Sequence, residues 1–153
     1  IQANDLVGRK TARDGGQSAR AIAEQIAKTE ADLHASGTAA ALSMARHLQT
    51  AREAFLQTVD FVAGKAKASP NAVYAGSVPY LMLTGNLVAG WQMGRALLVA
   101  QDKLAAGEEA AFMQAKIITA QFYAEHILTR VPGLAHTVCT GGESACALPL
   151  EAF

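Results

Sequence analysis

The sequence predicts an all-α protein, an antiparallel bundle of four long helices with short terminal helices. Over most of the chain, apolar residues return at alternating steps of three and four, as on one face of a helix. No stretch alternates polar and apolar residues in the manner of a half-buried strand. The hydrophobic residues make up 51% of the chain and the aromatic residues only 6%. Because much of the apolar fraction is Ala, we expect closely packed helix faces within one domain of 153 residues.

The first elements are a helix end and a long helix. Residues 1–11 have the pattern of the last turns of a helix, which the Arg-Asp-Gly-Gly segment 13–16 terminates. A long helix is expected from about Gly16 to Ala35, and Gly37 lies where a left-handed C-terminal cap belongs. Its apolar face is predicted to consist of Ala19, Ile22, Ile26, Thr29 and Leu33.

The second long helix is expected from about Thr38 to Ala68, with Thr38 as its N-cap. A helix of this length measures about 45 Å, and only a bundle of similar helices can cover its apolar side. Arg52 interrupts that side. The apolar stripe is made of Leu42, Ala45, Leu48, Phe55, Val59, Val62 and Ala66.

The third long helix begins in an uncharged segment. Asn71 is predicted to cap a helix that reaches about Ala106, and Pro79 to kink this helix or to mark its true start. The pair Gly90 and Gly94, which Gly85 and Ala89 extend, indicates the close approach of a neighbouring helix.

The segment Ser69–Gly94 has no charged residue and the length of a membrane span. It contains two prolines, two asparagines, Gln92 and four glycines. This composition favours a helix buried inside a soluble bundle, and a membrane role is not expected.

The fourth long helix follows a turn at residues 105–110 and is expected to stop near Arg130, before Pro132. A shorter helix should then cover about Leu134–Thr140. The fourth helix is predicted to direct toward the core Phe112, Ala115, Ile118, Phe122 and either Glu125 or His126. In the C-terminal segment, the residues predicted to lie on the bundle are Leu148, Leu150 and Phe153.

The charge balance excludes some partners. Lys plus Arg and Asp plus Glu number 13 each, so no basic footprint for nucleic acid or for an anionic membrane surface is present. Cys139 and Cys146 would lie about 10 Å apart on a helix, too far for a disulfide. We interpret both as reduced, buried thiols. No secretory signal is visible, and a cytoplasmic location is expected.

No catalytic, cofactor-binding or metal-binding residue is predicted within the chain. A di-metal site in a bundle needs Glu-x-x-His pairs, but Glu30 and His34 are four residues apart and Glu125 directly precedes His126. We expect His126 to be partly buried and bonded to the backbone or to a Tyr. Zinc needs four ligands in closely spaced pairs, and the zinc candidates fall short of that: His136, Cys139 and Cys146.

The opening stretch Ile-Gln-Ala-Asn-Asp-Leu-Val-Gly-Arg-Lys, residues 1–10, resembles the sequence just after the catalytic motif of acyl-CoA dehydrogenases. The residues that match one branch of the family are Ile1, Gln2, Asp5, Leu6, Val7, Gly8, Arg9 and Lys10. Residues 78–138 resemble the extra C-terminal helical domain of that branch, which is found in long bacterial members. The most telling pieces are Tyr80-Leu81, Val88-Ala89-Gly90, Ala120, residues 122–126 and the closing segment 147–153.

The resemblance implies a parent enzyme that oxidises an acyl-CoA to the trans-2-enoyl-CoA. A Glu a few positions before Ile1 would be its base, FAD its cofactor and an electron-transfer flavoprotein its electron acceptor. Residues 1–13 would be the tail of the preceding dehydrogenase helical domain, and residues 14–153 the C-terminal bundle. The chain would then be a piece of a homodimeric enzyme, inactive alone and without bound FAD.

The alternative is a free-standing helical protein-interaction module with no enzymatic role. The two readings differ at the start of the chain. An independent domain should begin with a capped helix near Gln17, and residues 1–11 would have no place in it.

Overall fold

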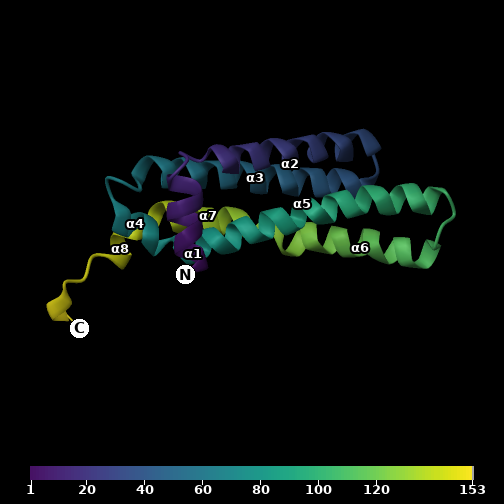
Figure 1. The fold of residues 1–153 in the computed structure, drawn as a ribbon. Coiled ribbons are helices and arrows are strands. Elements are labelled where there is room, and N and C mark those ends of the chain that lie inside the picture. The colour runs from purple at the N-terminus through teal and green to yellow at the C-terminus, as the bar shows by residue number, and fades with distance from the viewer. Residues whose placement is uncertain (153) are drawn as a thin grey trace.

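The computed structural model describes residues 1–152, and these residues form helices and no strands (Figure 1). The elements in order are α1 (Gln2–Asp5), a π-helix (Leu6–Ala12), α2 (Gln17–Ser36), α3 (Ala39–Lys65), α4 (Pro70–Ala75), α5 (Ser77–Ala105), α6 (Ala110–His126), a 3-10 turn (Leu128–Arg130), α7 (Val131–Thr140), α8 (Gly142–Ala145) and a second 3-10 turn (Leu150–Ala152). The four long helices are α2, α3, α5 and α6. The predicted fold class is confirmed.

The helices pack as two antiparallel pairs. α2 lies along α3, and α5 lies along α6, while α3 also contacts α5, α6 and α7 (Figure 1). α6 and α7 follow one another along the same side of α3 and α5, so that together they fill the fourth position of the bundle. α1 and the π-helix cross the bundle at one end, where the N-terminus lies beside α5 (Figure 1).

Apolar side chains from every long helix meet in the interior. α3 is the central element because it carries buried residues along its whole length. The largest side chains that are fully buried include Ile26, Leu33, Met44, Leu48, Val59, Val62, Tyr80, Leu83, Leu87, Leu97 and Leu128. Burial of this apolar surface is what stabilises the fold.

The predicted caps at the end of α2 and at the start of α3 are confirmed. Gly37 has φ of 70° and closes α2 in the left-handed conformation. Thr38 precedes α3, and its Oγ1 accepts a hydrogen bond from the Ala41 amide at 3.2 Å. The buried face of α2 differs in part from the prediction: Ile22 is exposed, whereas Ala23 and Glu30 are buried beside Ile26.

The uncharged segment forms two helices. α4 begins at Pro70 after Ser69, so the prediction that Asn71 caps a helix is wrong: a proline at the first helical position sets the start earlier. Gly76 separates α4 from α5, and Pro79 lies in the first turn of α5, where no N–H is needed. Of the two predicted roles of Pro79, a kink or a helix start, the structure confirms the helix start.

Glycines allow close helix contacts at two of the predicted positions. A Cβ on Gly90 would lie 2.5 Å from Leu128 Cδ2, and a Cβ on Gly94 would lie 3.2 Å from Leu33 Cδ1. A Cβ on Gly85 would meet no atom within 4 Å. The predicted close approach is confirmed at Gly90 and Gly94 and wrong at Gly85, which faces outward.

The predicted orientation of α6 is wrong. Its buried residues are Met113, Ile117, Ala120 and Ala124. The residues that were expected in the core are exposed instead, namely Phe112, Ala115, Ile118, Phe122, Glu125 and His126. Both arcs of this helix are apolar, and the small residues Ala120 and Ala124 take the inner one because they allow close packing.

The C-terminal part of the chain also departs from the prediction. α6 ends at His126, and Pro132 lies in the first turn of α7 instead of terminating a helix at Arg130. Leu148 is exposed and does not lie on the bundle. The predictions for the Leu150 side chain and for Phe153 lie outside the described residues.

Candidate functional site

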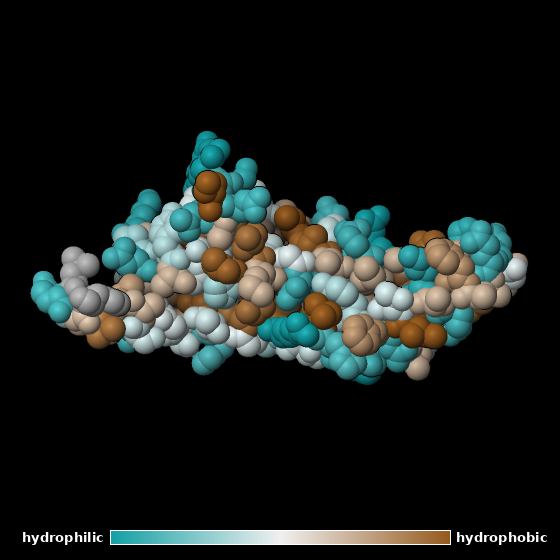
Figure 2. Space-filling view, turned by 90° about the horizontal axis from the view of Figure 1, so that it is seen from below, coloured by the Kyte–Doolittle hydropathy of each residue, from teal (hydrophilic) through white to brown (hydrophobic). Residues whose placement is uncertain are grey.

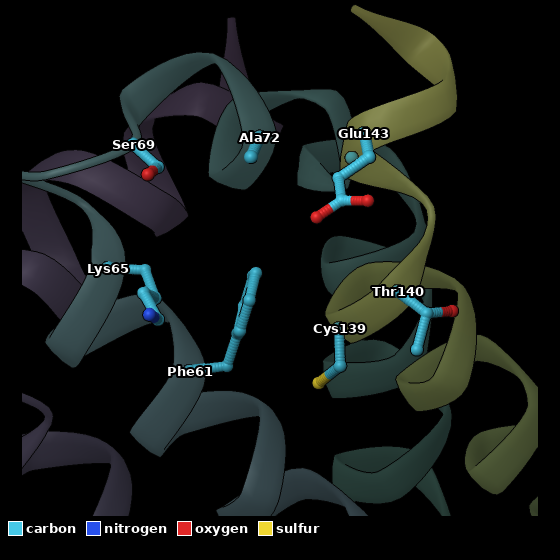
Figure 3. A pocket seen from close by; sticks show the side chains of 8 residues that line it. Phe61, Lys65, Ser69, Ala72, Cys139, Thr140 and Glu143 are labelled. Carbon is cyan, nitrogen blue, oxygen red and sulfur yellow. The ribbon is translucent and has the colours of Figure 1, made fainter.

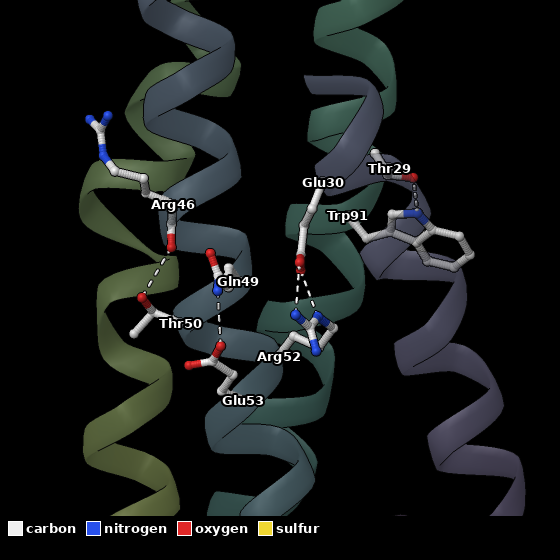
Figure 4. Close-up of polar contacts among 8 residues, drawn as sticks. All are labelled: Thr29, Glu30, Arg46, Gln49, Thr50, Arg52, Glu53 and Trp91. Carbon is white, nitrogen blue, oxygen red and sulfur yellow. Dashed lines mark hydrogen bonds and ion pairs between the residues drawn. The ribbon is translucent and has the colours of Figure 1, made fainter. Parts of the chain in front are cut away.

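A buried ion pair joins α2 to α3. Arg52 donates from Nε to Glu30 Oε1 at 2.8 Å and from a terminal nitrogen to Glu30 Oε2 at 2.9 Å (Figure 4). The hydrogen bond to Glu30 raises the pKa of the Arg52 guanidinium. Arg52, which interrupts the apolar stripe of α3, is therefore paired with Glu30 across the interface of α2 and α3. Both side chains are engaged with each other and not with a ligand.

Trp91 joins α5 to α2. Its Nε1 donates to Thr29 Oγ1 at 2.8 Å (Figure 4), and the Arg95 guanidinium lies 5.7 Å from the centre of its ring. The ring of Trp91 thus has a packing role between helices.

Tyr80 joins α5 to the π-helix. Its hydroxyl and Thr11 Oγ1 are 2.9 Å apart and both residues are buried, while its ring stacks with Phe55 at a centroid distance of 6.4 Å. Burial raises the pKa of the Tyr80 hydroxyl, although the hydrogen bond with Thr11 opposes this shift. This contact holds the crossing segment on the bundle.

A cleft of ≈ 400 Å³ lies between the end of α3, α4, α7 and α8 (Figure 3). Lys65 and Glu143 stand on opposite walls, and the Cys139 sulfur points into the space (Figure 3). Burial raises the pKa of the Cys139 thiol, and a hydrogen bond with Thr58 lowers it only in part. A thiol kept neutral in this way is a poor nucleophile at neutral pH.

The cysteines, histidines and carboxylates do not converge. Cys139 is half-buried and free, and Cys146 is free but exposed because it follows the short helix α8, so the predicted burial of Cys146 is wrong. His126 is exposed and stacks on Phe122 at 4.4 Å, which contradicts its predicted burial. Across residues 1–152, no three His, Cys, Asp or Glu side chains gather as metal ligands would.

The most unusual surface feature is apolar. Figure 2 shows hydrophobic side chains spread along the length of one face of the molecule. Large apolar side chains are exposed on two of the long helices: Val78, Met82 and Val99 on α5, and Phe112, Ile118 and Phe122 on α6. A shallow groove of ≈ 440 Å³ lies between Val99 on α5 and Phe112 on α6. Sequence reasoning missed this surface because it placed the apolar arc of α6 in the core.

No helix in the described part of the chain is both long and apolar enough to cross a membrane. The uncharged residues that raised this question are divided between α4 and α5, with a break at Gly76.

Comparison with known proteins gives consistent matches. The family model described as "Acetyl-CoA dehydrogenase C-terminal like" matches residues 21–149. The 3-methylmercaptopropionyl-CoA dehydrogenase of Ruegeria pomeroyi is 49% identical over 144 residues, which are 94% of this chain and 24% of that protein. The broad-specificity linear acyl-CoA dehydrogenase FadE5 of Mycobacterium tuberculosis is 32% identical over 144 residues, 84% of this chain and 22% of that protein. The chain thus spans about a quarter of the length of these relatives.

Proposed function

The chain belongs to the acetyl-CoA dehydrogenase C-terminal-like family, and from this premise we propose that it is the structural and oligomerisation domain of an FAD-dependent acyl-CoA dehydrogenase. The resemblance of residues 1–10 to the sequence after the catalytic motif and the names of the two relatives support this proposal. The observation that carries the oligomerisation role is the exposed apolar face of α6.

The reaction proposed for the complete enzyme is the oxidation of an acyl-CoA to the trans-2-enoyl-CoA. FAD would accept the hydride, and an electron-transfer flavoprotein would take the electrons onward. Two observations support placing the flavin elsewhere in the enzyme: the cleft beside Cys139 and the groove between α5 and α6 measure ≈ 400 and ≈ 440 Å³, and Trp91 and Tyr80 are engaged in contacts between helices. We therefore assign the flavin and the catalytic base to the rest of the polypeptide.

We propose a boundary at residue 13. Residues 1–13 would belong to the preceding helical domain of the enzyme, and residues 14–153 would form the bundle domain. Two observations support it: α1 and the π-helix cross the bundle instead of running along it (Figure 1), and the family match begins at residue 21. The proposed location is the cytoplasm, where free thiols such as Cys139 and Cys146 are stable.

The proposed assembly is a homodimer in which α6 contributes to the interface. Phe112, Ile118 and Phe122 are 54%, 57% and 57% exposed. α6 thus has a second apolar face besides the one in the core, and exposed apolar patches of this kind mark interaction surfaces. We call Ile118, Phe122 and Ala115 the outer face of α6.

The catalytic part of the proposal is tested by comparing the complete polypeptide with the 153-residue chain. The complete polypeptide should bind FAD, seen in its visible absorbance, and should oxidise an acyl-CoA. The chain alone should do neither. Flavin binding or dehydrogenase activity in the chain alone would contradict the assignment, and a flavin-free, inactive complete polypeptide would favour the interaction module.

The oligomerisation part is tested with Ile118→Asp and Phe122→Asp together in the complete polypeptide. Light scattering after gel filtration should show a dimer in the unmodified protein and a monomer in the double variant, because two buried carboxylates would disrupt an apolar interface. The matched control is Ile22→Asp on α2, which is also exposed and should leave the dimer intact. A double variant that stays dimeric would remove α6 from the interface.

A further inference from the structure

The outward side of the first half of α5 lacks the charges that a solvent-facing helix normally carries. Val78, Met82, Gly85 and Ala89 follow one another at steps of four, three and four, so they lie on one face. We call these four residues the α5 stripe. No charged residue occurs between Ser69 and Gly94.

Three residues of the α5 stripe, Val78, Met82 and Gly85, are exposed in this chain, and Ala89 is half-buried. Val78 is 57% and Met82 is 54% exposed. A Cβ placed on Gly85 would meet no atom within 4 Å, so the glycine leaves a shallow place in the middle of the stripe. The opposite side of α5 faces the core, where Tyr80, Leu83 and Leu87 are buried. The exposure therefore belongs to a second apolar face of the helix.

The position of α1 indicates what covers this face. α1 contacts α5, and the N-terminus of the chain lies beside the first half of α5 (Figure 1). The relatives are about four times as long as the chain, which covers 24% of the first. Polypeptide that precedes Ile1 would therefore enter next to the α5 stripe, whereas α6 lies in the half of the molecule away from the N-terminus (Figure 1).

We infer that the α5 stripe is the surface on which the preceding part of the same polypeptide packs, with an apolar element seated over Gly85 between Val78, Met82 and Ala89. This inference rests on the proposed function, since it requires the remainder of the enzyme. The inference divides the exposed apolar surface into two parts. The α5 stripe contacts the preceding part of the same polypeptide, and the outer face of α6 contacts a second copy.

The test is photo-crosslinking in the complete polypeptide with p-benzoylphenylalanine in place of Met82. Irradiation should give an adduct that has the mass of one chain on a denaturing gel, and mass spectrometry should place its partner peptide before Ile1. The same probe in place of Phe122 should give a product of two chains. The probe in place of Gln25, an exposed residue on α2, should give neither product.

Two outcomes would overturn the inference. The first is a product of two chains at position 82, which would assign the α5 stripe to a second copy. The second is a yield at position 82 no greater than that at Gln25. Flavin content and dehydrogenase activity, measured on the same preparations, report separately on the proposed function. A flavin-loaded, active enzyme without the adduct within one chain would refute this inference alone.

A second pair of measurements does not depend on crosslinking. Val78→Glu with Met82→Glu should lower the Tm of the complete polypeptide and leave the Tm of the 153-residue chain unchanged, because both side chains face water in the chain alone. Equal effects in the two proteins, or no effect in either, would contradict packing of the preceding polypeptide on the α5 stripe.

Discussion

Arg52 and Glu30 show how a single charged pair can control the stability of the α2–α3 interface. Glu30 is buried and its two oxygens accept both hydrogen bonds from Arg52. Arg52→Ala should lower the free energy of unfolding by about 3 kcal/mol, since it leaves a buried carboxylate without its partner. Urea denaturation of the 153-residue chain measures this change.

The control for Arg52 is the double variant Arg52→Met with Glu30→Leu. Apolar side chains of similar volume often replace a buried ion pair at little cost, so the double variant should recover most of the stability lost in Arg52→Ala. An Arg52→Ala chain as stable as the unmodified chain would show that the pair is solvated and not buried as described.

Tyr80 predicts a dependence of stability on alkaline pH. Its folded-state pKa is raised above the ordinary value of 10.0 by burial, so the stability it contributes is complete below pH 10 and is lost as pH rises through the raised pKa. The free energy of unfolding should therefore fall more steeply above pH 10 in the unmodified chain than in Tyr80→Phe.

At neutral pH, Tyr80→Phe should itself cost about 1 kcal/mol, because buried Thr11 loses its hydrogen-bond partner. Tyr123→Phe is the comparison variant: half-buried Tyr123 donates to the Asn86 carbonyl at 3.2 Å, and burial raises its pKa too, so this variant should show the same kind of change to a smaller extent. Chemical denaturation at a series of pH values measures both variants. If the free energy of unfolding depended on pH identically in Tyr80→Phe and in the unmodified chain, the raised pKa of Tyr80 would be contradicted.

Local signals made some residues predictable and left others undetermined. Thr38 and Gly37 act within a few residues of their own position, so their capping roles follow from the sequence. Arg52 was recognised as an interruption, but Glu30 as its partner was not. The two are 22 residues apart on different helices, and only the packing of α2 on α3 brings them together.

At the scale of helices, α6 shows where periodicity fails. Phe112, Ile118 and Phe122 form as good an apolar arc as Met113, Ile117 and Ala120, so the pattern alone cannot say which arc is buried. The structure selects the arc with smaller residues, which lets α6 lie close to α3 and α5. A helix with two apolar arcs is itself a sign of a second partner.

Helix α5 allows a direct comparison of two glycines. Gly90→Ala should destabilise the chain by about 2 kcal/mol, because the new Cβ would lie 2.5 Å from Leu128 Cδ2 and would overpack the core. Gly85→Ala in the same helix meets no neighbour and should stabilise the chain by about 0.5–1 kcal/mol through its higher helix propensity. Thermal denaturation of both variants of the 153-residue chain measures the difference. Equal changes in Tm would contradict the predicted contact at Gly90.

At the scale of the whole molecule, the fold class and the four long helices were predictable because each has a long apolar periodicity and clear end signals. Two other features could not be predicted from the sequence. One is the way α1 and the π-helix cross the bundle, and the other is the placement of α6 and α7 one after the other along the same side. Both depend on tertiary contacts such as those of Tyr80 with Thr11 and Leu128 with Gly90. The candidate surface was hidden for the same reason, since it became visible only when α6 was oriented.

The arrangement of the bundle predicts which helix opens last. α3 contacts α2, α5, α6 and α7, and Met44, Leu48, Val59 and Val62 are fully buried along it. α8, by contrast, has only Gly142 buried. Local opening follows burial and packing, so amide hydrogen exchange of the 153-residue chain should be slowest in the middle of α3 and fast in α8. Exchange measured by mass spectrometry on peptides from the two helices tests this order. Faster exchange in α3 than in α6 would mean that the hairpin of α5 and α6 is the stable unit, and that α3 is held by it.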